Sequence, residues 1–143
     1  MHTCNYVDIR DIANPPSFHD AELLSIEYRP DARSLDLALR RVADNVEVLR
    51  FSGVIAHRLT DFASQNMASR VLISPKYPFS PDEARAWIQW INSRDDSNAP
   101  AISAEKGSEY IRDFAAERRV LFVLEPSCGA EMAVLCETVS LKR

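Results

Sequence analysis

The chain has 143 residues, of which 46% are hydrophobic and 27% are charged. A chain of this size can form one domain and bury enough apolar surface to fold without disulfides or a structural metal. We therefore expect a single domain over residues 1–143, with residues 1–17 as an N-terminal segment. The formal net charge is −4 and the lysines and arginines are scattered, so we expect no nucleic-acid partner.

Cysteine usage favours a cytoplasmic protein. The three cysteines, Cys4, Cys128 and Cys136, are an odd set without a CxxC spacing, which predicts neither a disulfide framework nor a zinc site. Residues 1–11 lack the basic and apolar stretches of a signal peptide. No window approaches 18 apolar residues, so we expect no membrane partner.

The first half of the chain predicts three antiparallel strands. Apolar and polar residues alternate over 22–29 and again over 34–41, on either side of a Pro-Asp turn, which indicates a β-hairpin. Residues 45–59 read as a third, longer strand. The apolar positions change parity within it, which indicates a bulge or a strand covered on both faces. Gly53 is expected to mark a kink or a close backbone approach.

The clearest helix signal lies in the middle of the chain. Residues 67–74 fit either a fourth strand or a short helix, and three prolines follow. Ser80 can cap a helix, a proline suits its first turn, and Glu83 completes a capping box. Apolar residues then recur at helical spacing. This pattern predicts a helix over 81–92 that lies across the sheet.

The last third adds a second helix and the closing strands. Residues 108–118 can form a shorter helix, and 120–124 are a continuous apolar run typical of a central strand buried on both faces. Residues 126–129 predict a turn, and 131–141 a returning antiparallel strand. Together these patterns predict an α+β domain, with a mostly antiparallel sheet of about five or six strands packed by the helix 81–92 and, where it forms, by 108–118.

One short motif resembles a known family. Residues 18–21 read Phe-His-Asp-Ala and lead into a strand, and residues 51–54 read Phe-Ser-Gly-Val. This arrangement resembles small bacterial proteins of uncertain function, in particular the immunity protein 50 group of polymorphic toxin systems, over roughly residues 18–75. The resemblance implies a small cytoplasmic α+β protein that blocks a partner protein, and it implies no catalytic residues.

Four polar residues are candidates for a metal or acid–base site. His19 and Asp20 are adjacent, and a helical turn at His57 and Asp61 would align those two side chains on one face. Imidazoles and carboxylates together suit a divalent metal. The alternative is that Asp20 caps a turn through backbone N–H groups while His19 packs beside it, and we favour this ordinary role.

Aromatic residues near the helix are candidates for protein binding. Trp90 lies off the apolar stripe of the helix, and Tyr77 precedes the helix in a proline-rich loop. Exposed Trp and Tyr are common interface anchors, although a place at the edge of an ordinary core is the more frequent role of such residues. Cys128 could act as a nucleophile only beside a base, and no Cys-His signature surrounds it. No Walker loop, dinucleotide fingerprint or G-x-S-x-G is present, so we expect no cofactor.

The resemblance implies a bacterial protein of the immunity type that occludes another protein, and the lack of catalytic motifs favours a non-enzymatic role, with His19, Asp20, Tyr77 and Trp90 as candidate binding residues. One alternative is a metal-binding or hydrolytic enzyme that uses the His19, Asp20, His57 and Asp61 set. A second alternative is a homo-oligomeric structural domain, such as a homodimer formed by strand-edge pairing.

Overall fold

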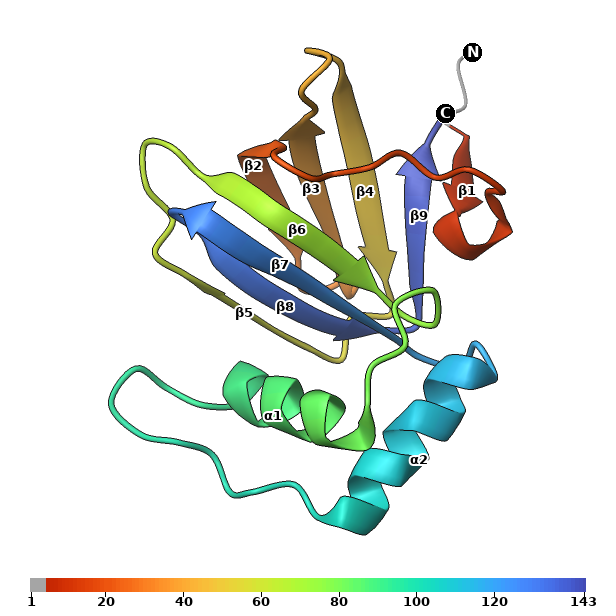
Figure 1. Cartoon of the computed structure of the whole chain (residues 1–143), viewed down its shortest axis with the longest axis vertical. Coiled ribbons are helices and arrows are strands. Elements are labelled where there is room, and N and C mark those ends of the chain that lie inside the picture. Colours follow the sequence, from red (N-terminus) through yellow and green to blue (C-terminus); the bar gives the residue numbers. More distant parts are fainter. Residues whose placement is uncertain (1–4) are drawn as a thin grey trace.

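The computed structural model describes residues 5–143, and within them nine strands form one antiparallel sheet accompanied by two α-helices and one short 3-10 helix (Figure 1). The strand order in the sheet is β1-β9-β4-β3-β2-β6-β7-β8-β5. The elements are β1 (Tyr6–Asp8), η1 (Ile9–Asp11), β2 (Glu22–Arg29), β3 (Ser34–Arg40), β4 (Val46–Ser52), β5 (Ala56–Thr60), β6 (Met67–Ile73), α1 (Pro81–Ile91), α2 (Ala104–Ala115), β7 (Val120–Cys128), β8 (Glu131–Cys136) and β9 (Thr138–Lys142). The expected α+β class is confirmed.

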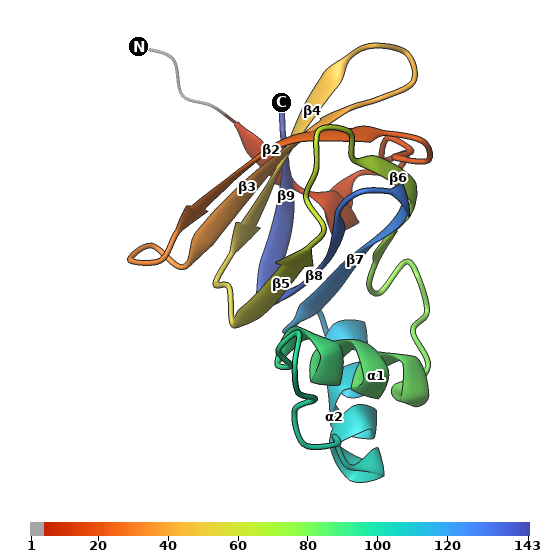
Figure 2. The same ribbon diagram turned by 90° about the vertical axis from the view of Figure 1, so that its left-hand side faces the viewer.

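The sheet is folded over so that its two halves face each other. The halves are β1-β9-β4-β3-β2 and β6-β7-β8-β5, and one residue pair, Glu22 with Met67, joins them in the ladder. Figure 2 shows the two halves from the side. Alternate residues of both halves point inward and form the main core, in which Leu37 of β3 and Phe122 of β7 have no exposed surface. The rings of Phe51 and Phe122 meet edge to face at 4.8 Å across this core.

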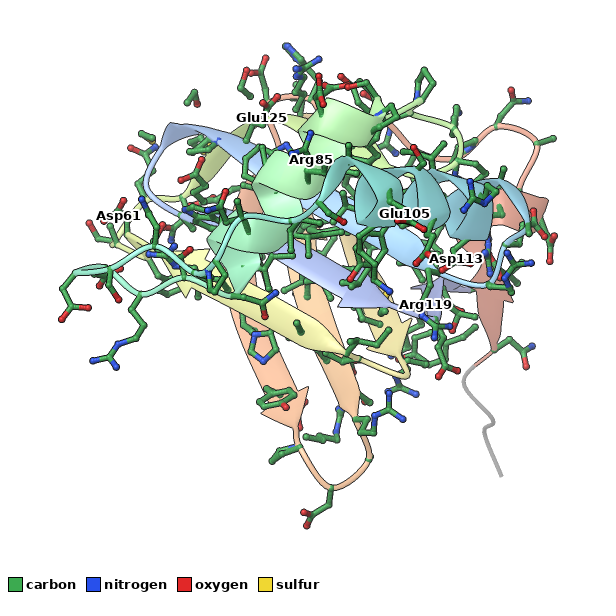
Figure 3. All side chains as sticks on the ribbon, turned by 90° about the horizontal axis from the view of Figure 1, so that it is seen from below. Asp61, Arg85, Glu105, Asp113, Arg119 and Glu125 are labelled. Carbon is green, nitrogen blue, oxygen red and sulfur yellow. The ribbon has the colours of Figure 1, made fainter. Side chains whose placement is uncertain are left out.

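The helices cover the outer face of the second half. Ile88 of α1 and Phe114 of α2 pack with Leu121 and Leu135 in a second apolar cluster. Figure 3 views this layer from below, with Arg85 on α1 and Asp113 on α2 in front of the strands. Because β7 and β8 lie between the two clusters, their side chains are buried on both faces, as the apolar run 120–124 predicted.

The expected number of five or six strands is wrong because the chain crosses twice between the two halves. The predicted strand 45–59 is two strands, β4 and β5, separated at Gly53, and the predicted strand 131–141 is β8 and β9, separated at Glu137. Gly53 has φ +63°, and a Cβ there would lie 2.6 Å from the Glu137 side chain. The two crossings are joined where Glu137 N–H donates to the Ser52 carbonyl (3.1 Å). Strand-forming residues continue on both sides of each corner, so each stretch reads as one long strand, and the change of parity within 45–59 indicates only a bulge or a strand covered on both faces.

The remaining elements follow the sequence patterns closely. Residues 67–73 are a strand, and α1 has the full capping box, in which Ser80 Oγ accepts from Glu83 N–H and Glu83 accepts from Ser80 N–H. The second helix begins at Ala104 rather than at 108, because Ser103 caps it. The strand β7 continues to Cys128, so the turn expected over 126–129 is shorter. Part of the N-terminal segment pairs with β9 as strand β1.

Candidate functional site

A groove of about 680 Å³ separates two segments that are far apart in the sequence. One wall, here called the N-terminal wall, is made by residues 9–19. The other wall is β6 with the loop after it, residues 70–77, and Glu117 lines one end. In Figure 1 the N-terminal wall runs from β1 across the upper part of the sheet to the start of β2, with β6 below it. Pockets of about 300–1,000 Å³ are typical of ligand sites.

The N-terminal wall is held by an arginine beneath it. The Arg10 side chain is 8% exposed and donates from Nε and Nη2 to both carboxylate oxygens of Asp8, at 3.0 and 2.7 Å. Its Nη1 donates to the Glu117 carbonyl oxygen at 3.0 Å, which ties the wall to the segment after α2. Burial opposes ionisation of Asp8, but the bonds from Arg10 outweigh it, so the Asp8 pKa lies below its ordinary value. Ile9 and Phe18 anchor the wall in the main core.

Two of the predicted binding residues, His19 and Tyr77, line this groove. His19 Nδ1 lies 3.1 Å from Asp20 Oδ2, and both side chains are more than half exposed. Asp20 has φ +60° and its N–H donates to the Ala68 carbonyl oxygen at 2.9 Å, so it forms the turn into β2 at the margin of the groove. The adjacent pair His19 and Asp20 therefore lies in a surface turn.

Tyr77 is fixed by polar contacts. Its Oη donates to Glu83 Oε2 at 2.7 Å, and this bond raises the pKa of Tyr77. The same carboxylate completes the capping box of α1, and the Ser80 backbone bond and then the Tyr77 bond lower the Glu83 pKa. The Arg70 guanidinium lies 5.7 Å from the Tyr77 ring centroid and pairs with Glu125 across β6 and β7. Tyr77 thus presents a fixed ring at the groove.

The two other candidate residues of the metal hypothesis, His57 and Asp61, lie on β5 and just beyond it. No helical turn aligns them: four residues of strand span roughly 13 Å. The His57 ring meets the Tyr28 ring edge to face at 4.5 Å, and burial lowers the His57 pKa. Asp61, labelled in Figure 3, is exposed with φ +59°. Within residues 5–143, no group of three or more His, Cys, Asp or Glu side chains is placed to hold a metal ion.

Trp90 lies away from the groove, on the last turn of α1. Its ring is half-buried and meets Trp87 edge to face at 5.7 Å. The Arg58 guanidinium of β5 lies 4.7 Å from the Trp90 ring centroid, and it donates to the Trp90 carbonyl oxygen and to Asp95. These contacts make Trp90 part of the margin of the second cluster.

The polar residues near the β7–β8 turn are structural. Asn66 is buried, and its Oδ1 accepts from the N–H groups of Ala63 and Ala130 while its Nδ2 donates to the Ala63 carbonyl. Cys128 is exposed at the end of β7. Cys136 is buried, and burial strongly raises the pKa of its thiol, which disfavours the nucleophilic thiolate.

The groove also contains residues that the sequence patterns did not single out as a site. Arg10, Arg70, Lys76 and Glu117 line it. The charge of Arg10 is balanced by Asp8 and that of Arg70 by Glu125, which leaves Lys76 as the cation of the lining without a carboxylate partner among residues 5–143. Lys76 is exposed and makes no ion pair within the described residues. No local motif marks these residues, because about sixty residues separate the two walls and only tertiary contacts bring them together.

Comparison of the chain with protein-family models, with curated proteins and with solved structures gives no match. Among residues 5–143, neither helix has the length and apolar character needed to cross a bilayer.

Proposed function

We propose that this chain is a non-enzymatic binding protein of the immunity type, which acts in the bacterial cytoplasm by occluding a partner protein. The observation that carries the proposal is the groove between residues 9–19 and 70–77. It adjoins the Phe-His-Asp-Ala turn on which the resemblance to immunity proteins rests. The expected binding residues His19 and Tyr77 both line it, and Asp20 contacts His19 at its margin.

Both walls of the groove are held in place by contacts within the chain, so a partner can bind without first ordering them. Its N-terminal wall is fixed by Arg10, and its opposite wall is a strand of the central sheet. A surface that is already ordered loses little conformational entropy when a partner binds. The exposed ammonium group of Lys76 favours a carboxylate on the partner surface, because complementary charge speeds association and selects among partners.

We place the partner at the groove rather than at Trp90. Arg58 already covers the Trp90 ring, so a partner would have to displace a guanidinium that makes two hydrogen bonds. Tyr77 and Lys76, by contrast, reach the groove from one loop.

The test begins with the gene adjacent to this one, which the proposal requires to encode a toxin domain. Purified chain should bind that toxin domain and protect bacteria that express it. Lys76→Glu should weaken binding by about tenfold, which corresponds to one interfacial charge contact. The matched control is Lys106→Glu, which makes the same charge change on α2, outside the groove. Lack of binding and of protection would contradict the proposal.

The same purified protein tests the two alternatives. Stoichiometric bound metal that disappears with His19→Ala would support the metal-dependent reading. A stable dimer by sedimentation that does not bind the toxin domain would support the homo-oligomeric reading.

A further inference from the structure

The edge of β6 that faces the groove is unpaired over its second half. On this side β6 pairs with β2 at Met67, and the backbone contacts continue only as far as the bond from Asp20 N–H to the Ala68 carbonyl. Beyond Ala68 the two strands diverge, since β2 belongs to one half of the sheet and β6 to the other. Residues 70–73 of β6 then line the groove.

The ladder on the other side of β6 shows which backbone groups face the groove. β6 pairs with β7 in continuous register from Arg70 with Glu125 to Ile73 with Phe122, and the next residue, Ser74, donates its N–H to Leu121. In an antiparallel ladder hydrogen-bonded pairs alternate with non-bonded pairs. The backbone groups of Val71 and Ile73 therefore point away from β7.

Three of these backbone groups have no partner within residues 5–143. The Ile73 carbonyl accepts a hydrogen bond from Tyr77 N–H at 2.9 Å. The three groups that remain without a partner among the described residues are the Ile73 N–H, the Val71 N–H and the Val71 carbonyl. Val71 and Ile73 are one strand repeat apart, so these groups have the spacing with which an extended chain bonds to a strand edge.

The chain's own N-terminal wall is unable to fill this edge. It carries Pro15 and Pro16 opposite β6, and proline has no N–H to donate to a ladder. The wall is also tied to the segment after α2 by the bond from Arg10 to the Glu117 carbonyl. The edge and the wall therefore stay apart and leave a groove between them.

The surroundings of the edge define the chemistry of an added strand. Val71, Ile73 and Ile12 pack against the main core beside the groove, which favours apolar side chains at alternate positions of the occupant. Lys76, in the loop after β6, is exposed and makes no ion pair within the described residues, which favours a carboxylate there.

We propose that the groove binds an extended acidic and apolar segment of a partner protein, which adds as a strand to the edge of β6 at Val71 and Ile73. This inference rests on the proposed protein-binding function and specifies its mode. Strand addition supplies affinity through main-chain hydrogen bonds and selectivity through alternate side chains.

A capped peptide of sequence Glu-Val-Glu-Val-Glu is the probe. Titrated into the full chain to millimolar concentration, it should slow amide hydrogen exchange at Val71 and Ile73 by about tenfold or more, because both N–H groups gain an acceptor. The same peptide with both valine nitrogens methylated keeps every side chain and loses backbone donors, so its affinity should fall by about tenfold or more. Equal affinity of the two peptides, or unchanged exchange at both amides, would overturn strand addition.

A variant of the chain separates this inference from the proposed function. Val71→Pro removes one groove-facing N–H that β7 does not use, and proline is compatible with a strand edge. With an unchanged melting temperature, it should weaken binding of the toxin domain by about tenfold or more. If the toxin domain binds this folded variant as tightly as the parent, the protein-binding function stands and strand addition at β6 is wrong. If the toxin domain does not bind the parent chain, the proposed function itself fails.

Discussion

Replacing Arg10 should destabilise the protein far more than replacing an exposed arginine. The Arg10 guanidinium makes three side-chain hydrogen bonds, two to the Asp8 carboxylate and one to the Glu117 carbonyl, while its side chain is 8% exposed. Hydrogen bonds to charged groups contribute about 1.5–3 kcal/mol each in favourable settings. Because the Asp8 carboxylate is 23% exposed, solvent screens part of this energy. We expect Arg10→Ala to lower the free energy of unfolding by about 2–4 kcal/mol.

The assay is urea unfolding followed by the fluorescence of Trp87 and Trp90, which both lie on α1. The matched control is Arg94→Ala, because Arg94 is 79% exposed and its carboxylate partner Asp96 lies 3.6 Å away. An exposed pair of this kind contributes about 0–1 kcal/mol.

A double-mutant cycle with Asp8→Asn isolates the contact itself. The two single changes should be strongly non-additive, with a coupling energy of about 1–3 kcal/mol, because both act on the same pair of hydrogen bonds. A loss for Arg10→Ala no larger than that for Arg94→Ala, together with additivity in the cycle, would refute the assignment of Arg10 as the residue that fixes the N-terminal wall.

Three further predictions concern the core and its margins. Asn66→Ala should lower the free energy of unfolding by about 2–4 kcal/mol in the same assay, because two backbone N–H groups lose their acceptor; a loss below about 0.5 kcal/mol would contradict this. In a Cys4→Ser variant, a thiol reagent should modify Cys128 in the native protein and Cys136 only on unfolding, and equal rates would refute the burial argument. Burial opposes ionisation of Asp36, but hydrogen bonds from two arginines outweigh it and lower its pKa; stability from this group should be lost as the pH falls below about 4. The free energy of unfolding should therefore fall less steeply with decreasing pH in Asp36→Asn than in the parent chain. An unchanged slope would count against this role of Asp36.

The sequence alone determined the local elements of this protein. Alternation over 22–29 and 34–41 predicted β2 and β3, because a half-buried strand must present one face to the core. The capping box at Ser80 and Glu83 predicted the first residue of α1, because the groups that satisfy a helix N-terminus are adjacent in the chain. Such signals need only neighbouring residues, so they can be read without the fold.

Tertiary structure decided how the strands are divided and where the groove lies. The break at Gly53 depends on Glu137 approaching from a distant strand, and local alternation does not register that contact. Likewise, the sequence singled out His19 and Tyr77 separately. Only the divergence of β2 from β6, and the prolines of the N-terminal wall, place them on opposite sides of one groove. The physical reason is that a surface built from segments sixty residues apart is specified by the packing of two sheet halves, and no local stretch of residues encodes that packing.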